Sequence, residues 1–263
     1  MKTIKVGSTQ VHIRNDDFFK VKIETPHIKE QQKIAAFLTE VDNKIEQLTK
    51  KKQLLVDYKK GVMQQIFSQE IRFKQDDGSD YPDWEVKALG SVITEYKNKS
   101  TYNDEHPVMT SSTKGLVFQK DYFGDNRLVD RSNIGFNIIP PNYITYRSRS
   151  DNRRFTFNMN SLGTTGIVSS YYPVFKISTG CNKFFIELTK VNVLKFGKYS
   201  VGTSQTVLSL NEIKKIKFKL PVQEEQEKIG YFLTEIDTKI NQVEKQLAGT
   251  KQFKSGLLQQ MFV

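Results

Sequence analysis

Cysteine, histidine and tryptophan are scarce in this 263-residue chain, which holds one Cys, three His and one Trp. A single cysteine cannot form an internal disulfide, and Cys181 lies in an apolar run where we expect a small buried side chain. His12, His27 and His106 are scattered without the spacing of metal ligands. The sequence also has no phosphate-binding loop and no zinc pattern. It therefore predicts neither a bound metal nor a catalytic centre.

Long apolar runs are also missing. No stretch of about 18 apolar residues occurs, so the sequence predicts no membrane span. The first ten residues, MKTIKVGSTQ, lack the apolar core of a signal peptide. We therefore expect a cytoplasmic protein.

Positive charge is in excess, with 40 Lys and Arg against 29 Asp and Glu and a net charge of +11. Such an excess suggests a polyanionic partner such as nucleic acid. Because many basic proteins bind no polyanion, net charge alone does not predict nucleic-acid binding. The position of the charge along the chain has to decide between these two possibilities.

The sequence contains an internal repeat, because residues 6–67 match residues 201–262 without a gap at a shift of 195 positions. KIAAFLTEVDNKI at 33–45, for example, corresponds to KIGYFLTEIDTKI at 228–240. Each copy has a proline followed by acidic residues and then apolar residues that alternate by four and three. This pattern predicts a long helix in each copy.

The apolar positions of the two helices have a period near 3.5, which favours packing against a partner helix. Helices of about 40 residues would each extend about 60 Å. An ordinary amphipathic helix packed on its own domain is the alternative. Because the two copies match in length and phase, we expect them to pair with each other through Leu38, Val41, Ile45, Leu233, Ile236 and Ile240.

Between the two helices, residues 72–220 have a different pattern. Short runs rich in Val, Ile, Phe and Tyr are separated by Gly, Asn, Asp and Ser. We interpret these runs as strands; they include WEVKAL, GLVFQ, YITYR, FTFNM, GIVSSYYPVFKI and KFFIEL. The chain is therefore expected to have an α+β fold, with a mainly β domain that contains some helix and two long helices.

The basic residues of this domain gather in residues 147–198, whereas residues 76–130 are rich in acid. Four arginines fall within YRSRSDNRRF, and the planar guanidinium can bind guanine edges or phosphate with two hydrogen bonds. Ser148, Ser150 and Asn152 lie between them as neutral donors and acceptors. A solvated charged loop is the alternative. Adding small polar residues from the loops SSTK, GTTG, SSYY and GTSQ, we predict DNA contacts by Arg147, Arg149, Arg153, Arg154, Ser111, Lys114, Thr165, Ser169, Lys198 and Gln205.

Two segments resemble catalytic motifs without fulfilling their requirements. PDWEVK at 82–87 has the letters of a metal-dependent nuclease site, with Asp83 and Glu85 as metal ligands and Lys87 assisting water. Its spacing is too short to place the carboxylates on two separate strand segments, so a turn leading into a strand is favoured. NIIPPNY at 137–143 resembles the NPPY loop of amino-methyltransferases, but the order differs and no glycine-rich turn precedes it.

Taken together, the sequence resembles the DNA-specificity subunits of type I restriction-modification systems. VGTSQTVLSLNEIKKIKFKLPVQEEQEKIGYFLTEIDTKI at 201–240 and its earlier copy at 26–67 carry the resemblance, with support from YITYRSRSDNRRF and GIVSSYYPVFKI. The resemblance covers essentially the whole chain. It implies four segments: the end of a first target-recognition domain (1–25), a conserved long helix (26–71), a complete target-recognition domain (72–220) and a second conserved long helix (221–263).

The resemblance also implies a function. In that family two recognition domains each bind one half of a split DNA site, and two antiparallel helices set their spacing. The subunit is not an enzyme; it holds methylation subunits, which carry S-adenosylmethionine, and restriction subunits. With one complete recognition domain, this chain resembles a half-length subunit that binds double-stranded DNA at one half-site, with no cofactor of its own. Pairing of the two helices within one chain and a homodimer with a symmetric target both remain open. A metal-dependent nuclease and a coiled-coil assembly protein that binds no DNA are the rival hypotheses.

Overall fold

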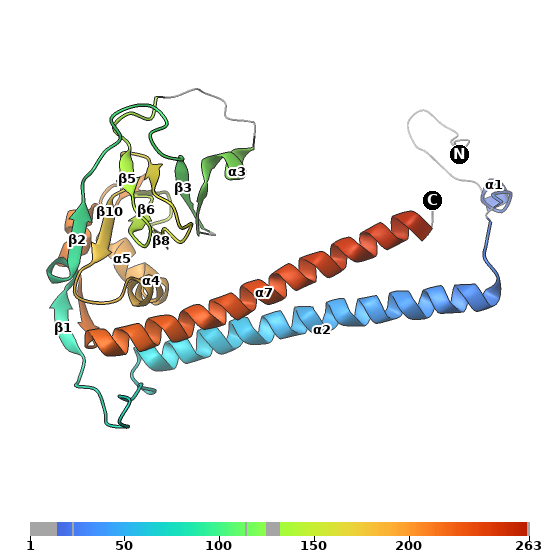
Figure 1. Cartoon of the computed structure of the whole chain (residues 1–263), viewed down its shortest axis with the longest axis horizontal. Helices are drawn as coiled ribbons and strands as arrows, with labels where there is room; N and C mark the ends of the chain where they lie inside the picture. Colours follow the sequence, from blue (N-terminus) through green and yellow to red (C-terminus); the bar gives the residue numbers. More distant parts are fainter. Residues whose placement is uncertain (1–14, 23, 114, 125–131, 262–263) are drawn as a thin grey trace. The chain divides into compact units, whose positions relative to one another are not determined.

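The structure is a computed structural model that describes residues 15–22, 24–113, 115–124 and 132–261. The chain forms two units, one of residues 1–51 with 243–263 and the other of residues 52–242. Two long helices, α2 (Ile28–Phe67) and α7 (Gln223–Met261), belong partly to each unit (Figure 1). They lie within the segments 26–71 and 221–263, which the family resemblance implies to be the two long helices.

The other elements are short, and all except α1 lie between the two long helices in the sequence. The remaining helices are α1 (Asn15–Phe18), η1 (Leu89–Ser91), α3 (Gln119–Phe123), α4 (Asn182–Val191), α5 (Val193–Lys198) and α6 (Leu210–Lys215). The strands are β1 (Glu85–Ala88), β2 (Ile93–Tyr96), β3 (Met109–Ser112), β4 (Gly115–Phe118), β5 (Asn137–Ile139), β6 (Ile144–Tyr146), β7 (Arg149–Ser150), β8 (Phe157–Met159), β9 (Gly166–Val168), β10 (Val174–Ile177), β11 (Thr206–Val207) and β12 (Lys217–Leu220). The predicted α+β class, with a long helix at each end of a β-rich region, is confirmed.

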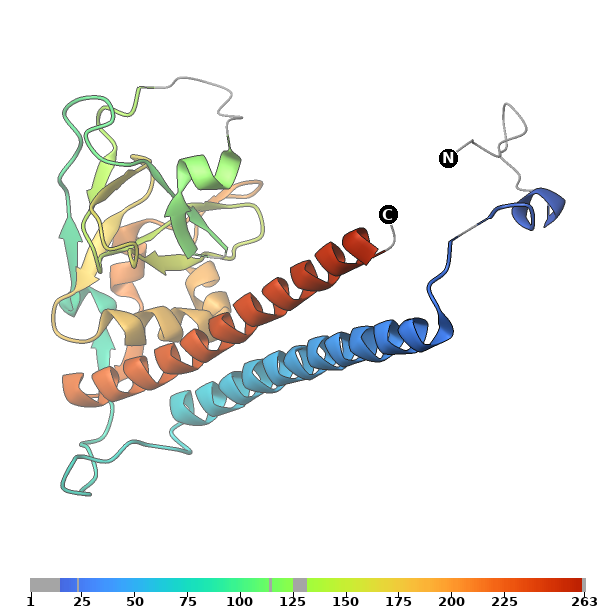
Figure 2. The same cartoon turned by 45° about the vertical axis from the view of Figure 1, so that its right-hand side comes forward.

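The centre of the β-rich body is an antiparallel sheet with the strand order β2-β10-β6-β8, whose strands are labelled in Figure 1; Figure 2 shows the same body turned by 45°. Smaller antiparallel pairs surround it: β1 with β12, β3 with β4, β5 with β9 and β7 with β11. The β1–β12 pair joins the first and last strands of the body, with Glu85 opposite Leu220 and Ala88 opposite Lys217. Both ends of the recognition region therefore meet at one place, beside the chain's entry from α2 and its exit into α7.

Aromatic side chains fill the core of this body. Tyr146 and Phe157 stack with ring centres 4.7 Å apart, and Phe185 packs edge-on against Phe157 and Phe175. Tyr146 is fully buried, and its hydroxyl donates a 2.8 Å hydrogen bond to the carbonyl of Leu208. The core therefore fixes β6 immediately before the arginine-rich segment begins.

The run KFFIEL is helical, so its interpretation as a strand was wrong. It forms most of α4, which buries Phe184, Phe185 and Leu188 along one face. A short apolar run cannot be assigned to helix or strand from periodicity alone, and here tertiary packing decides against the strand preference of phenylalanine. Cys181 precedes this helix and is buried with a free thiol, as expected.

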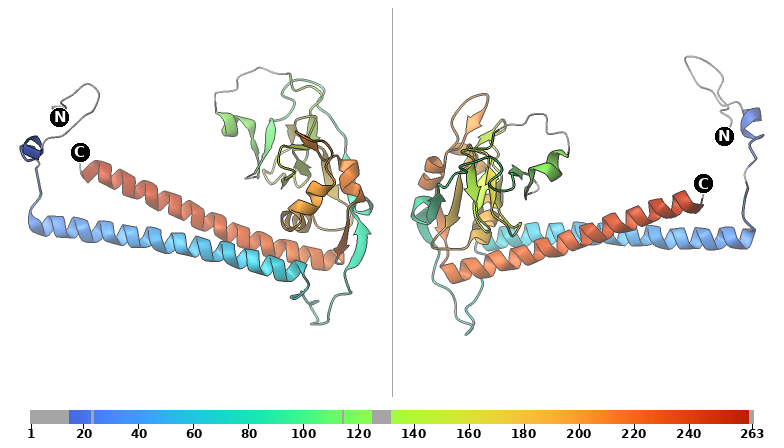
Figure 3. Two further views of the ribbon diagram at one scale, coloured as in Figure 1. Left: turned by 180° about the vertical axis from the view of Figure 1, so that it is seen from behind. Right: turned by 45° about the horizontal axis from the view of Figure 1, so that its top comes forward.

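In the unit 52–242, the end of α2 and the start of α7 lie side by side and run in opposite directions (Figures 1 and 3). Ile66 of α2 and Leu233 and Ile236 of α7 join the same buried core as the recognition body. Lys59 donates a 2.6 Å hydrogen bond to Asp237 and lies 2.9 Å from the carboxylate of Glu187 on α4. The helices thus hold the body through both apolar and ionic contacts.

A second lysine, Lys190, contacts the same two carboxylates. Lys190 of α4 contacts Glu187 at 2.7 Å and Asp237 at 3.5 Å. Burial alone lowers the pKa of Lys190, but the two carboxylates outweigh it and hold that pKa above its ordinary value.

The other unit has the same ion pair. Lys254 of α7 donates to Asp42 of α2 at 2.5 and 2.7 Å. Asp42 and Asp237 are equivalent under the 195-residue shift, and so are Lys59 and Lys254. The two ion pairs are therefore related by the internal repeat.

The six predicted helix-pairing residues are all at least partly buried. Val41, Leu233 and Ile236 are buried, whereas Leu38, Ile45 and Ile240 are half-buried. Their roles in pairing stay predictions. Of the expected first-domain remnant, residues 1–14 and 23 lie outside the described residues. None of the described helices is long and apolar enough to cross a membrane.

Candidate nucleic-acid interface

A polar groove of about 410 Å³ opens on the recognition body. Three segments form it: the tip of the β3–β4 hairpin, α3, and the arginine-rich segment around β7. Its lining consists of hydroxyl, amide and guanidinium groups with one aromatic ring and one carboxylate: Ser111, Ser112, Thr113, Tyr122, Arg147, Arg149, Ser150, Asp151, Asn152, Arg154 and Thr156. Such a lining offers many hydrogen-bond donors and a positive charge to a polar, anionic ligand.

The arginine-rich segment is held by backbone and hydroxyl contacts. Strand β7 pairs with β11, with Ser150 opposite Thr206, and the hydroxyl of Thr206 donates to the carbonyl of Ser150 at 2.8 Å. The hydroxyl oxygen of Ser150 and the amide oxygen of Asn152 both accept from the backbone N–H of Arg154 at 3.1 Å. Arg153 has a φ of 57°, a left-handed conformation that turns the chain sharply. The turn is therefore ordered before any ligand binds.

Alternation along the extended chain separates the arginines from the serine between them. Arg147 and Arg149 are exposed and line the groove, whereas Ser148 points inward and donates to the carbonyl of Tyr171 at 2.7 Å. The Ser148 hydroxyl is therefore already used within the protein. Its role is to fix the segment against the turn that carries Tyr171.

Arg149 uses the same turn. Its guanidinium lies 4.5 Å from the centre of the Tyr171 ring, which is cation–π geometry. The opposite wall of the groove is fixed by Asn158 of β8, whose side-chain amide donates to the hydroxyl of Ser111 at 2.7 Å and to the carbonyl of Ser112 at 2.8 Å. Since Ser111 accepts this bond, its own hydroxyl hydrogen is directed elsewhere and can be donated to a ligand.

The predicted contact residues fall into four groups. Ser111, Arg147, Arg149 and Arg154 line the groove together. Arg153 and Gln205 lie beside it: Gln205 reaches Asp151 at 3.5 Å, and Arg153 reaches the carbonyl of Gly202 at 3.4 Å. The groove lining does not include Thr165, Ser169 or Lys198, and Lys114 lies outside the described residues.

Several groove residues were not predicted. Tyr122, Thr113 and Thr156 line the groove, and Tyr171 holds Arg149 beside it. Tyr122 lies in DYFGD within the acidic part of the sequence, so the cluster of positive charge does not point to it. The one available signal was an aromatic residue in a short polar segment, because aromatic side chains can stack on bases.

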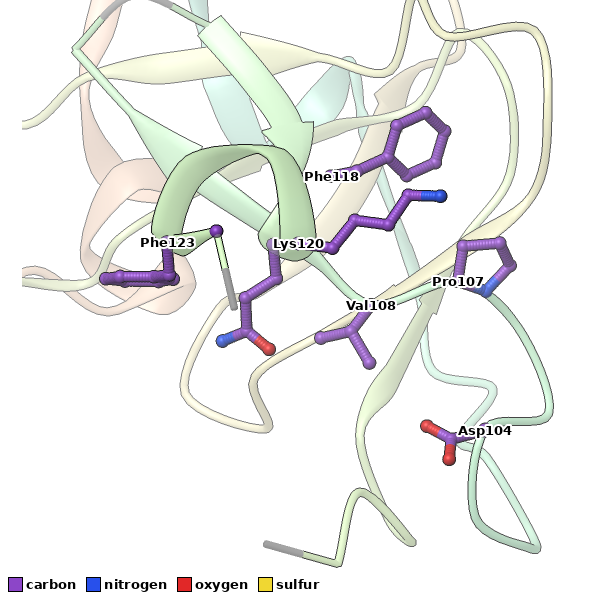
Figure 4. Close-up of a pocket in the computed structure, with 8 residues that line it drawn as sticks. Asp104, Pro107, Val108, Phe118, Lys120 and Phe123 are labelled. Carbon is purple, nitrogen blue, oxygen red and sulfur yellow. The ribbon is translucent and has the colours of Figure 1, made fainter. Parts of the chain in front are cut away.

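A second hollow of about 600 Å³ lies beside α3 (Figure 4). Pro107, Val108, Phe118 and Phe123 give it apolar walls, with Lys120 and Asp104 as its charged groups. Consecutive residues of α3 therefore line different surfaces, Tyr122 the polar groove and Phe123 the apolar hollow.

The nuclease-like segment does not assemble a site. Asp83 is fully exposed and lies 3.5 Å from Arg72, while Glu85 and Lys87 pair with each other at 3.0 Å on β1. Among the described residues no cluster of three or more His, Cys, Asp or Glu side chains could hold a metal ion. Residues 82–84 have no regular secondary structure and lead into strand β1 at Glu85, so the strand is as predicted and the turn is not seen.

Comparison with known proteins decides the family. The type I restriction modification DNA specificity domain matches residues 1–56 and 81–249. The chain belongs to this family. The type I restriction enzyme MjaVIII specificity subunit of Methanocaldococcus jannaschii is 32% identical over 98 residues, which cover 35% of this chain and 23% of that protein. The putative type I restriction enzyme MjaX specificity subunit of the same organism is 30% identical over 112 residues, covering 38% and 26%.

The fold agrees with the family. A type I restriction-modification S subunit from M. genitalium superposes with a TM-score of 0.59 at 17% identity, covering 99% of this chain and 68% of that one. The matched region spans about a quarter of the curated relatives' length. As a member of the DNA-specificity family, the chain carries its arginine-lined groove on a type I specificity fold.

Proposed function

We propose that this chain selects one half of a bipartite DNA site for a type I restriction-modification complex. The observation that carries the proposal is the groove in which Arg147, Arg149 and Arg154 converge with hydroxyl and amide side chains. Guanidinium groups supply the charge that phosphates require and the paired donors that guanine requires. The prearranged turn supports the proposal, because contacts that need no reordering cost less entropy on binding.

Binding of the full chain to a fluorescent DNA duplex at two salt concentrations tests this. Each neutralised phosphate contributes a slope of about −0.9 to the logarithm of affinity against the logarithm of salt. Two such contacts lower the affinity about 12-fold for a fourfold rise in salt. The double variant Arg153→Ala/Arg154→Ala should weaken binding and leave the thermal transition in place. Lys97→Ala removes one exposed charge outside the groove and should change little.

Other outcomes would favour the rival hypotheses. Wild-type protein that is folded but binds no duplex at low salt would support an assembly protein without DNA binding. Cleavage of the duplex with magnesium or manganese, lost in Asp83→Ala, would support a nuclease.

The internal repeat supports the bipartite part of the proposal. In one unit the ion pair Lys59–Asp237 lies where α4 of the recognition body docks, through Glu187 and Lys190. The equivalent pair, Lys254–Asp42, has the same residues in the other unit, where Phe37 and Phe253 are half exposed and pack edge-on. A second recognition domain, docked on these repeated residues, would give the complex its second half-site.

We further propose that the chain holds the methylation subunit, which would supply S-adenosylmethionine, and the restriction subunit. Light scattering on the chain, alone and mixed with the cognate methylation subunit, tests the scaffold. The mass should rise by whole methylation subunits, and an unchanged mass would contradict the scaffold role. A homodimer that takes up methylation subunits would mean that a second copy supplies the second domain and that the target is palindromic.

A further inference from the structure

The four arginines of the segment 147–154 differ in what holds their guanidinium groups. Arg149 is stacked on Tyr171, and Arg153 donates to the carbonyl of Gly202 from a strained left-handed backbone. Within the described part of the chain, no other group bonds or ion-pairs with the guanidinium of Arg147 or Arg154. Two arginines are therefore restrained, and two have hydrogen-bonding forks available to a ligand.

The backbone of the two available arginines is nevertheless fixed. Arg147 directly follows Tyr146, which is fully buried and bonded to Leu208. The N–H of Arg154 is bonded to both Ser150 and Asn152. A side chain with a fixed backbone and a guanidinium that makes no internal hydrogen bond suits recognition. Its position is defined, while its hydrogen-bond donors remain available to a ligand.

The surroundings of these two tips favour a base edge over a phosphate. Both side chains line the groove with Ser111, Thr113 and Asn152, as Arg149 also does, and these groups can bond to base edges. Asp151 is the single carboxylate among the groove residues, and it lies 3.5 Å from the amide of Gln205 rather than against an arginine. By contrast, the face of the Arg149 guanidinium is covered by an aromatic ring, so its charge remains while its orientation is limited.

We infer that Arg147 and Arg154 are the specificity-determining arginines and recognise guanine in the major groove, whereas Arg149 and Arg153 contact the phosphate backbone. This division rests on the proposed function, because it concerns how the same groove binds DNA. The O6 and N7 atoms of guanine accept two hydrogen bonds from one guanidinium, which a lysine ammonium cannot reproduce with the same geometry. Phosphate contacts need chiefly the charge.

Arg→Lys substitution separates the two roles, since it keeps the charge and removes the fork. The full chain is incubated with duplexes that carry a randomised segment, and the bound fraction is sequenced. Arg147→Lys and Arg154→Lys should each lose preference for guanine at one position, by about 5- to 150-fold, with unchanged binding to unselected DNA. Arg149→Lys and Arg153→Lys are the matched controls and should enrich the same sequence as wild type.

Arg→Ala variants give an independent readout of the phosphate contacts. Arg149→Ala and Arg153→Ala should weaken binding to all sequences alike and reduce the salt slope by about one each. Circular dichroism confirms that each variant is folded. The inference is overturned if Arg147→Lys and Arg154→Lys select the wild-type sequence, or if the control lysine variants lose the guanine preference. Folded wild-type protein that enriches no sequence would instead overturn the proposed function together with the inference.

Discussion

The carboxylate of Glu225 holds the start of α7 to the recognition body, and its loss should be costly. Glu225 is completely buried and accepts hydrogen bonds from Arg72 Nε and Nη2 at 3.2 and 2.8 Å and from Trp84 Nε1 at 3.1 Å. The hydrogen bond to this carboxylate raises the pKa of Arg72, so the guanidinium remains charged. Glu225→Gln keeps the shape of the side chain and removes its charge.

The structure gives the expected magnitude. Removing one partner of a buried ion pair costs about 3–5 kcal/mol, because the other charge is left without compensation. The Arg72 side chain keeps 22% of its surface exposed, so water can partly solvate it after the change. We therefore expect Glu225→Gln to lower the free energy of unfolding by about 2–3 kcal/mol. Substituting Arg72→Met as well should cost less than the two single changes added together.

Urea unfolding followed by circular dichroism and by tryptophan fluorescence measures the effect. Trp84 is the one tryptophan of the chain and bonds directly to Glu225, so its emission reports on this junction. The internal repeat supplies a matched control, because Glu30 occupies the equivalent position in α2 and is exposed. Glu30→Gln should change the stability by less than about 0.5 kcal/mol. A Glu225→Gln protein as stable as the Glu30→Gln protein would refute the reasoning.

Two further predictions concern the core and the helix contact. Burial raises the pKa of Tyr146 far above its ordinary value of 10.0, so above about pH 10 the unfolded side chain loses a proton that the folded one keeps. The contribution of Tyr146 to the free energy of unfolding should be complete below pH 10 and fall by about 1.4 kcal/mol per pH unit above pH 10. Urea titrations at several alkaline pH values measure this loss, and Tyr146→Phe should remove it. A Tyr146→Phe protein that loses stability with pH as steeply as wild type would contradict the prediction. A Cβ at Gly230 would lie 2.8 Å from the backbone nitrogen of Phe184. Gly230→Ala should therefore lower the free energy of unfolding by about 1–3 kcal/mol, although alanine has the better helix propensity. A higher melting temperature of the variant would show that α4 and α7 can move apart at this contact.

The long helices were predictable because their signals are local. The copies match over residues 6–67 and 201–262, and a 3.5-residue period specifies a partner helix without reference to the rest of the chain. The helix α4 was not predictable in the same way. Its Phe184, Phe185 and Leu188 are apolar enough for either structure, and the core that decides between them is assembled from distant segments.

The groove was predictable only in part for a similar reason. Its arginines are adjacent in sequence, so their charge was visible as a cluster. Tyr122 and Thr113 reach the same groove from α3 and the β3–β4 turn, and only the fold brings them there. Lys198 belongs to the same basic stretch of sequence, yet the groove lining does not include it.

Differences between the two repeat copies bear on which domain could dock on the second set of repeated residues. Gly230 lets the start of α4 approach α7 closely, and the equivalent residue in α2 is Ala35. If an identical domain docked on α2 in the same way, its α4 would approach Ala35 as closely as this α4 approaches Gly230. The methyl group of Ala35 would then be too close to the backbone of that α4. The ion-pair residues Asp42 and Lys254 are kept, so the position still suits a recognition domain of this family. The repeat therefore disfavours the docking of an identical recognition domain on this part of α2.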